Sequence, residues 1–326
     1  MEFELISRLL KATARQREDV VLGTGDDGAV LAVPEGQQLV ASVDAMVEGV
    51  HFLPGTHAAD LGWKALAVNL SDLAAMGASP AWALMSLTLP RADAGFVDGL
   101  AAGFDALARR HKLALVGGDT TSGPLNVSVT VLGLVPAGKA LTRSGARPGD
   151  VVFVSGVLGG GAAGLHCLDK SHADADRLLA APGDAREELI ERYRRPQPRV
   201  DLGRNLRDGA SACIDLSDGL LADLGHLCRA SGVGADIDIA RLPCSPGLKP
   251  LFGEAGAIEY ALGGGDDYEL CFTVAEQHAD ELASDLVRAG HEITRIGRIT
   301  EGEGVRALGP GGKRVTPRWR GWEHFG

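Results

Sequence analysis

The chain has 326 residues, 45% of them hydrophobic and 23% charged, and this composition excludes a disordered or fibrous protein. Its 43 Asp and Glu residues outnumber 32 Lys and Arg residues, and the net charge of -11 disfavours binding to nucleic acid or to an anionic membrane. No apolar run approaches the ~20 residues of a membrane-spanning helix and the first residues, MEFEL, do not resemble a signal peptide, so we expect a cytoplasmic protein without membrane or nucleic-acid partners.

The first half of the chain alternates segments of helical and of strand periodicity. In chain order, the pattern predicts a helix over residues 3–15, strands over 20–22, 29–33 and 39–43, a helix over 58–76, a strand over 82–89, a helix over 96–110, and strands over 114–116 and 127–135. A stretch rich in Gly, Arg and Pro follows over residues 136–150. We place the domain boundary there, which gives domains 1–138 and 139–326.

The second half also mixes both kinds of element. The pattern predicts helices over residues 160–168, 187–193, 200–207, 220–230 and 276–289, strands over 151–154, 212–214, 235–239, 269–274 and 293–299, and a polar loop over 169–184. Because strands and helices are interspersed in both halves, we expect an α+β fold made of two mixed α/β domains.

Common cofactor signatures are absent from the sequence or poorly placed. The five cysteines include no C-x-x-C pair and the nine histidines no H-x-H or H-x-x-x-H pair, which argues against disulfides and a zinc site. Residues 159–164 (GGGAAG) satisfy the dinucleotide pattern G-x-G-x-x-G, but the acidic residues about 20 positions later fall in the polar loop. We therefore interpret this motif as a tight turn between a strand and a helix.

Aspartates recur at the ends of apolar segments or interrupt them. Asp72 lies within an apolar predicted helix, Asp44 and Asp119 follow predicted strands, and Asp215 and Asp218 bracket a turn after another strand. Taken singly, each is an ordinary turn residue or helix cap, and Asp218 can cap the helix predicted from residue 220. Taken together, and with few Lys or Arg nearby in sequence, they suit Mg²⁺, which prefers oxygen ligands from carboxylates and substrate phosphates.

Glycines accompany several of these aspartates. Asp26 and Asp27 lie between Gly25 and Gly28, and residues 263–265 (GGG) precede a further Asp-Asp pair. Glycine lets backbone N–H groups approach phosphate oxygens closely. The sequence therefore predicts a polyvalent phosphate held through Mg²⁺.

Several short segments contain these aspartates or lie between them. They are residues 23–29 (GTGDDGA), 42–44 (SVD), 64–77 (KALAVNLSDLAAMG), 116–121 (VGGDTT), 141–146 (LTRSGA), 214–220 (IDLSDGL) and 264–270 (GGDDYEL). In this order, the segments resemble the thiamine-monophosphate kinase family, in the superfamily of aminoimidazole-ribonucleotide synthetase. The resemblance extends from Phe3 to Phe325, essentially the whole chain.

The resemblance implies that the γ-phosphoryl group of ATP is transferred to thiamine monophosphate with the help of several Mg²⁺ ions, as the last step of thiamine diphosphate biosynthesis. It also implies two domains of the aminoimidazole-ribonucleotide synthetase type. The N-terminal domain, residues 1–138, is expected to bind ATP and Mg²⁺ and to form a homodimer through its sheet. The C-terminal domain, residues 139–326, is expected to complete the active site.

Carried over residue by residue, the resemblance assigns roles to individual positions. Relatives often have Thr where this chain has Val43, which leaves only a backbone carbonyl to coordinate, and commonly Glu where it has Asp266. The implied Mg²⁺ ligands are Asp27, Ser42, Val43, Asp44, Asp72, Asp119, Asp215 and Asp218; the implied ATP contacts are Gly118, Asp119, Arg143 and Ser217; and the implied thiamine-phosphate contacts are His51, Asp266 and Trp322.

The implied reaction needs no general base. The acceptor is a phosphate monoester with a second pKa of about 6, so at neutral pH it is mostly a nucleophilic dianion. The enzyme must instead overcome repulsion between two anions by positioning them and neutralising their charge. Among the implied site residues we expect Asp72, Asp119 and Arg143 to be the most important for this.

Other interpretations remain open. Arg143 alone fits a solvated linker arginine, His51 a surface-loop histidine, and Trp322 a structural anchor of the C-terminal tail. Within the superfamily, selenophosphate synthetase needs a reactive Cys or selenocysteine near the N-terminus and the hydrogenase-maturation relative a C-terminal Cys. The first Cys here is Cys167 and the chain ends in HFG. A non-catalytic nucleotide or metal sensor is a further alternative.

Overall fold

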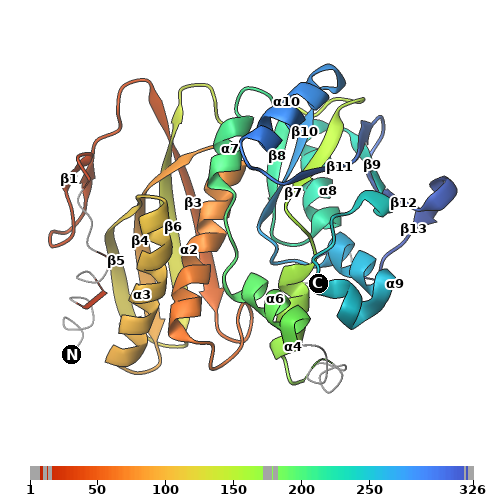
Figure 1. Ribbon diagram of the computed structural model, residues 1–326. Helices are drawn as coiled ribbons and strands as arrows, with labels where there is room; N and C mark the ends of the chain where they lie inside the picture. The colour runs from red at the N-terminus through yellow and green to blue at the C-terminus, as the bar shows by residue number, and fades with distance from the viewer. Residues whose placement is uncertain are drawn as a thin grey trace. The chain divides into compact units, whose positions relative to one another are not determined.

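The computed structural model describes residues 17–171 and 183–318 together with residues 8, 9, 13, 178 and 321. The chain divides into two compact units, one formed by residues 1–73 and 78–140 and the other by residues 74–77 and 141–326 (Figure 1). Each unit combines strands and helices, which confirms the α+β class expected from the sequence. The helix predicted over residues 3–15 and the predicted site residue Trp322 fall outside the described residues, apart from residues 8, 9 and 13.

The first unit is built on a four-stranded sheet in the order β3 (Gln37–Val47), β6 (Asn126–Pro136), β4 (Ser79–Leu89) and β5 (Ala114–Ser122). β6 pairs antiparallel with β3 and β4, whereas β4 and β5 are parallel and are connected through α3 (Ala94–Arg110). α2 (Ala58–Ala75) and α3 lie together against one face of the sheet (Figure 1). The two helices pack so closely that a side chain at Gly103 would overlap the backbone of Ala59.

Alternation along β6 separates a covered face of this sheet from an open one. Val127, Val129 and Val131 are fully buried on the helix side, while the residues between them are half-buried. On the open side, Leu39 and Val43 of the edge strand β3 are 47% and 59% exposed. Among the described residues, the exposed large apolar side chains all belong to the first unit except that of Val287.

A short antiparallel hairpin of β1 (Val20–Leu22) and β2 (Val30–Leu31) packs over Trp82 on the open side of the sheet. Asp19, just before β1, accepts a hydrogen bond from the indole Nε1 of Trp82 at 3.1 Å and two from Arg17. The bonds from Arg17, and to a lesser degree the bond from Trp82, lower the pKa of Asp19. The hairpin loop, which contains a predicted metal ligand, is therefore anchored at its base.

The second unit contains a seven-stranded sheet in the order β13 (Arg314–Val315), β12 (Gly304–Leu308), β9 (Gly234–Asp238), β11 (Ile293–Thr300), β7 (Val151–Ser155), β10 (Glu269–Val274) and β8 (Ala212–Leu216). Its helices are α4 (Gly160–Leu168), α6 (Gly183–Arg194), α7 (Val200–Leu206), α8 (Leu220–Ser231), α9 (Leu248–Gly263) and α10 (Glu276–Arg288). β10 runs antiparallel to its two neighbours, β7 and β8. Three strand ends therefore lie together at one end of the sheet: the C-terminal ends of β7 and β8 and the N-terminal end of β10.

The helix α9 and the strands β12 and β13 of the second unit are not predicted from the sequence. α9 contains Pro250, and Gly253 within it has a φ of +70°, so the chain is kinked and the helical periodicity is interrupted. Leu251 and Tyr260 nevertheless pack into the core beside α4 and α6. Tertiary packing thus stabilises a helix whose local sequence does not favour one.

Two strands of the first unit extend further than predicted. β3 pairs with β6 as far as Val47, and β5 pairs with β4 as far as Ser122. Asp44 and Asp119 consequently lie inside strands, and the prediction that each follows the end of its strand is wrong. Polar residues interrupt the apolar pattern at these positions, but they are exposed or half-buried. The hydrogen-bonded pairing of the strands can therefore continue past them.

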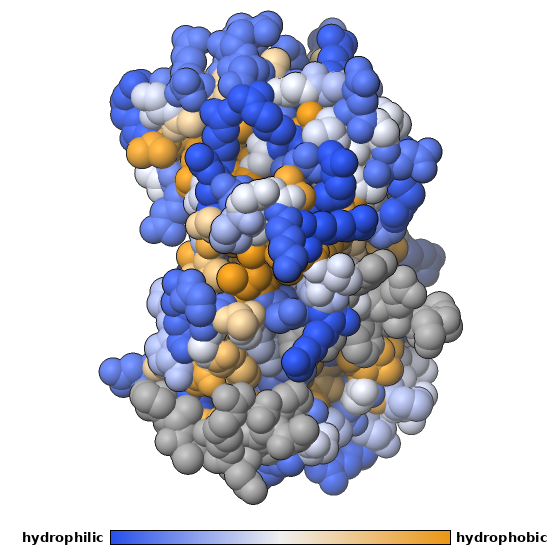
Figure 2. Space-filling model, turned by 90° about the vertical axis from the view of Figure 1, so that its right-hand side faces the viewer, coloured by the Kyte–Doolittle hydropathy of each residue, from blue (hydrophilic) through white to orange (hydrophobic). Residues whose placement is uncertain are grey.

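Hydrophilic residues cover most of the face shown in Figure 2, and apolar residues form patches among them. Over the ranges for which placement is described, no helix combines the length and apolar character that crossing a membrane requires.

Candidate functional site

Two predicted metal ligands of the first unit, Ser42 and Asp72, are in direct contact. The Ser42 hydroxyl on β3 donates to the Asp72 carboxylate on α2, with Oγ and Oδ2 2.5 Å apart. Asp44 lies on the same face of β3, and its backbone N–H donates to Asn69 Oδ1 at 2.9 Å. The Asn69 amide in turn donates to the Ala65 carbonyl at 2.9 Å, which fixes its orientation. The face of β3 toward α2 thus carries two of the predicted ligands, Ser42 and Asp44, and α2 places a third, Asp72, against it.

Val43 lies between these residues, and its side chain therefore points to the open face of the sheet. A hydroxyl at this position, as relatives often have, would also point away from α2. The side chain of residue 43 is therefore not available on the side of the other predicted ligands, and only the backbone of Val43 could coordinate.

Gly118 lies within β5 at a position that requires glycine. Its φ is +157°, and a side chain there would overlap the carbonyl oxygen of Met85 in β4. Asp119 is exposed, and its carboxylate accepts the backbone N–H of Thr120 at 2.9 Å. The packing of β5 on β4 therefore explains why residue 118 is glycine. As a result, no side chain covers the backbone just before the predicted ligand Asp119.

Asp27 lies in the exposed loop between β1 and β2. Its backbone N–H donates to Oδ1 of Asp26 at 2.8 Å, and both residues are exposed. Among the described interactions, this is the one hydrogen bond that involves a side chain of Asp26 or Asp27.

Asp215, Asp218 and Asp223 form a cluster of carboxylates at the C-terminal end of β8. Asp215 is 5% exposed within the strand, and Asp218 lies in the turn that follows it. Asp223, in the first turn of α8, accepts the backbone N–H groups of Asp218 and Gly219, both at 3.0 Å. Desolvation, together with the charges of Asp218 and Asp215, raises the pKa of Asp223 to about 8. The three carboxylates therefore lie close enough to repel one another.

The sequence analysis did not single out Asp223. The available signal was its place in the first turn of the helix predicted over residues 220–230, where an acidic side chain can satisfy unpaired N–H groups.

The donors at the predicted metal positions suit Mg²⁺. They are carboxylate and hydroxyl oxygens, with no thiol or imidazole among them. In the part of the chain that the structure describes, however, no three His, Cys, Asp or Glu side chains are gathered as a ready-made metal site. Magnesium sites are usually completed by water and substrate phosphates, so the donor set fits an ion that arrives with its nucleotide.

Arg143 is exposed and lies near α8. The Ser231 hydroxyl of α8 donates to its backbone carbonyl at 3.1 Å. The pKa of His226 is lowered by desolvation and by the charges of Arg229 and Arg143, while the charge of Asp218 acts in the opposite direction. Arg143 and Asp218 thus both lie within electrostatic reach of the same imidazole.

Asp266 lies beside Ser217 at the shared end of the second sheet. The backbone N–H of Asp266 donates to the Ser217 carbonyl, and that of Tyr268 donates to the Leu216 carbonyl, both at 2.8 Å. Asp266 and Tyr268 have φ values of +64° and +50°, which non-glycine residues rarely adopt. The Tyr268 hydroxyl donates to Asp266 Oδ1 at 2.9 Å. The structure thus brings a predicted thiamine-phosphate contact next to a predicted ATP contact.

His51 lies in the loop after β3, in the first unit. Its Nδ1 accepts the backbone N–H of Val47 at 3.0 Å, so the neutral ring carries its proton on Nε2. Trp322, the third predicted thiamine-phosphate contact, lies outside the described residues.

The glycine motif over residues 159–164 begins at Gly159, the N-cap of α4, and its remaining residues lie in the first turns of that helix, so the turn after β7 ends where the motif begins. The Asp267 carboxylate accepts the backbone N–H groups of Gly159 and Gly161, at 2.6 and 3.0 Å. A side chain at Gly164 would overlap the carbonyl of Leu189 in α6. The glycines are therefore explained by close packing within the protein, without a dinucleotide.

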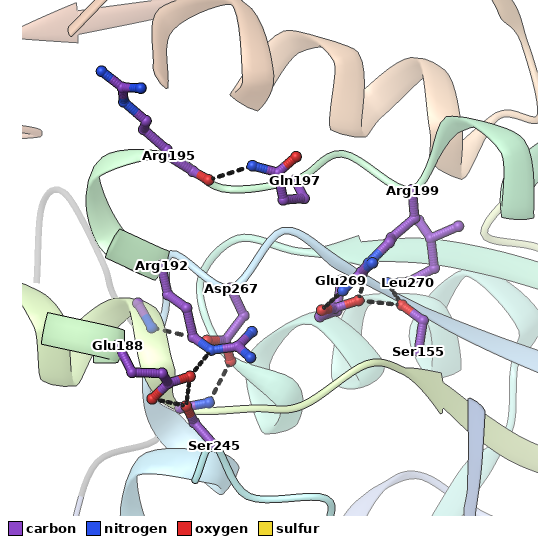
Figure 3. Close-up of polar contacts among 12 residues, drawn as sticks. Ser155, Glu188, Arg192, Arg195, Gln197, Arg199, Ser245, Asp267, Glu269 and Leu270 are labelled. Atoms are coloured by element: carbon purple, nitrogen blue, oxygen red, sulfur yellow. Dashed lines mark hydrogen bonds and ion pairs between the residues drawn. The ribbon is translucent and has the colours of Figure 1, made fainter. Parts of the chain in front are cut away.

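Figure 3 shows a second carboxylate near this turn, that of Glu269 at the start of β10. Arg199 donates to it from Nε and Nη2 at 2.6 and 2.5 Å, and the Ser155 hydroxyl donates to it at 2.5 Å. Desolvation lowers the pKa of Arg199, but the bonds to Glu269 outweigh this effect and raise it. The sequence analysis missed this ion pair because its partners are distant in sequence and carry no motif.

The requirement for glycine at position 118 can be tested by substitution. We expect Gly118→Ala to lower the free energy of unfolding by about 1–3 kcal/mol, because the new methyl group forces β5 away from β4. Gly117→Ala is the matched control, since its methyl group would meet only the movable end of the Leu84 side chain at 3.0 Å. Urea unfolding of both variants measures the difference, and equal losses would refute the explanation.

Two family models match the chain. The model described as AIR synthase related protein, N-terminal domain, matches residues 25–135, and the corresponding C-terminal domain matches residues 147–309.

Individual proteins with these domains are similar over almost the whole chain. Thiamine-monophosphate kinase of Escherichia coli K12 is 47% identical over 325 residues, which cover 99% of this chain and 98% of the relative. The crystal structure of thiamine-monophosphate kinase from Stenotrophomonas maltophilia K279a has a TM-score of 0.86 at 46% identity and covers 96% of this chain and 98% of its own. The structure of AaThiL complexed with AMPPCP and TMP has a TM-score of 0.77 at 36% identity, with 99% and 97% covered.

Proposed function

This chain belongs to the thiamine-monophosphate kinase family, and on that premise we propose that it transfers the γ-phosphoryl group of ATP directly to thiamine monophosphate, giving thiamine diphosphate and ADP. That the enzyme is a kinase follows from its family. The observation that carries the proposal is the 47% identity to the Escherichia coli enzyme along 99% of this chain. A relative that was solved with AMPPCP and TMP supports ATP as co-substrate and thiamine monophosphate as acceptor.

The proposed chemistry is an in-line attack by an oxygen of the acceptor phosphate on the γ-phosphorus of ATP. The acceptor dianion is already a nucleophile, so no side chain has to remove a proton from it. The protein contributes by holding the two anions in line and by placing positive charge and N–H donors around them. This chemistry agrees with the proposed site, whose phosphate and metal contacts include Asp, Ser, Gly and Arg residues. No catalytic His–Asp or Ser–His pair is implied.

We propose that Mg²⁺ binds at the carboxylates already described. Bound at these positions, the ions would neutralise phosphate charge as the γ-phosphoryl group moves. The bond from Ser42 orients the Asp72 carboxylate. The pKa of Asp223 is raised by desolvation and also by the charges of Asp218 and Asp215, which places several carboxylates close together beside Asp215. The proposed ligands are Asp27, Ser42, the backbone of Val43, Asp44, Asp72, Asp119, Asp215 and Asp218.

We propose Gly118, Asp119, Arg143 and Ser217 as contacts of ATP. Arg143 is exposed and carries a planar guanidinium with five N–H donors, which suits it to phosphate oxygens. Ser217 lies in the turn between β8 and α8, and its hydroxyl would donate to a phosphate oxygen. ATP is abundant inside cells, and we accordingly propose a cytoplasmic location.

We propose His51, Asp266 and Trp322 as contacts of thiamine monophosphate. The thiazolium ring of thiamine carries a permanent positive charge, so a site for it should offer a carboxylate and an aromatic face. Asp266 supplies the carboxylate at the shared end of the second sheet, beside Ser217. Trp322 would supply the aromatic face, because indole is the most favourable side chain for a cation–π contact.

The acceptor is tested by an ADP-release assay with ATP and Mg²⁺. We expect release to depend on thiamine monophosphate and to be at least ~10-fold slower with thiamine, pyridoxal phosphate or ribose 5-phosphate, because each lacks the phosphate dianion or the thiazolium cation. Thiamine diphosphate should form in equal amount to ADP. A nucleotide or metal sensor would bind ATP and show no acceptor-dependent release, and that result would refute the proposal.

The first unit is proposed to form a homodimer through the open face of its sheet. Leu39, Val43 and Leu84 are exposed there, and an apolar face beside an edge strand favours a protein partner. We expect light scattering at micromolar concentration to give twice the 33.9 kDa mass of the chain. Val43→Glu should shift the mass toward one chain, with Val287→Glu, on the second unit, as the control that leaves it unchanged. A stable wild-type monomer would contradict the dimer.

A further inference from the structure

The turn that begins α4 is held by a carboxylate from a distant part of the chain. Asp267 uses Oδ2 to accept the N–H of Gly159 at 2.6 Å and Oδ1 to accept the N–H of Gly161 at 3.0 Å. Gly159 is the N-cap residue of α4, has a φ of +82° and provides no side chain to cap the helix. Asp267 therefore satisfies N–H groups that the start of a helix leaves unpaired, with the favourable sign of charge.

The loop that contains Asp266 is enclosed on two sides. On one side, the Ala162 N–H donates to the Gly265 carbonyl at 3.0 Å, and a side chain at Gly161 would overlap the Asp266 carbonyl. On the other side, the Asp266 N–H donates to the Ser217 carbonyl at 2.8 Å. The backbone of Asp266 therefore lies between the first turn of α4 and the turn after β8.

Asp266 keeps a backbone conformation that a side chain disfavours. Its φ is +64°, and such a conformation persists only where the surrounding contacts impose it. The next residue, Asp267, imposes it through two bonds to α4, and the Tyr268 hydroxyl holds the Asp266 carboxylate itself. Desolvation raises the pKa of Asp267 to about 7, while the two N–H groups and the nearby Arg192, also drawn in Figure 3, act in the opposite direction.

We propose that Asp267 is a positioning residue for the acceptor: its two bonds to the α4 turn hold Asp266 in the conformation that meets thiamine monophosphate. The inference rests on the proposed function, because that function makes Asp266 an acceptor contact. On this proposal Asp267 acts through Asp266, because both of its carboxylate oxygens are engaged by the N–H groups of Gly159 and Gly161. The start of α4 over residues 159–161 thus supplies the backbone N–H groups that bind the Asp267 carboxylate.

The test is Asp267→Asn, which keeps the size of the side chain. Asparagine offers one acceptor oxygen, and its NH₂ group would face the second N–H, so one bond is lost and Asp266 can relax. We expect KM for thiamine monophosphate to rise ~10-fold and KM for ATP to change less than ~2-fold, the scale of one unsatisfied buried donor.

Asp150→Asn is the matched control. Asp150 is buried, and its Oδ2 accepts the Arg147 N–H at 3.0 Å and the Ser211 hydroxyl at 2.6 Å. It precedes β7 and so lies at the opposite end of the strands from Asp267. We expect this variant to leave the ratio of the two KM values unchanged, whatever its effect on the melting temperature.

Tyr268→Phe provides a second variant, which keeps the aromatic ring and removes the hydroxyl that bonds to Asp266. It should raise KM for thiamine monophosphate selectively, by ~3-fold or more. Equal rises in both KM values, or wild-type values in a folded Asp267→Asn enzyme, would overturn the positioning role. A wild-type protein without acceptor-dependent ADP release would refute the proposed function instead, so the two failures are distinguishable.

Discussion

Burial and mutual repulsion of carboxylates at the end of β8 constrain the connection between β8 and α8. Desolvation, together with the charges of Asp218 and Asp215, raises the pKa of Asp223, and all three residues lie at or near the turn that joins a buried strand to α8. A protein gains no stability from such crowding, because desolvation and like charges both disfavour ionised carboxylates. The crowding favours a cationic partner, and on the proposed function that partner would be Mg²⁺ bound together with the nucleotide.

The strand order brings the carboxylate cluster close to the other connections of the proposed site. β10 runs antiparallel to β7 and β8, so three connecting segments meet at one end of the sheet. One connection carries the carboxylate cluster, the second begins α4, and the third contains Asp266. Ion pairs with arginine, such as Arg199–Glu269, lie at the base of these connections and fix the start of β10. This end of the sheet thus combines a paired charge, capped N–H groups and the aspartates that we propose as ligand contacts.

Sequence reasoning located the aspartate-rich segments well but not their local geometry. Asp44 and Asp119 interrupt apolar patterns, and the pattern alone places them after strands, whereas backbone pairing with β6 and β4 carries both strands past them. The roles of Asp223 and Asp267 depend on N–H groups that become unpaired only when a helix starts nearby. For Asp267, that helix is more than a hundred residues away in sequence, so no local signal could have found it. The α+β class, by contrast, follows from interspersed periodicities that each half of the chain shows on its own.

The most direct test of the charge account is thermal melting of the wild type and Asp215→Asn with and without Mg²⁺ and a non-hydrolysable ATP analogue. Without ligands, the account predicts that Asp215→Asn melts at a higher temperature, because one of the repelling charges has been removed. With both ligands in large excess, the wild type should gain more and become the more stable protein, since a ligand at 100 times its Kd adds about 2.7 kcal/mol to the state that binds it. An equal gain in both proteins, or no gain in the wild type, would contradict the account.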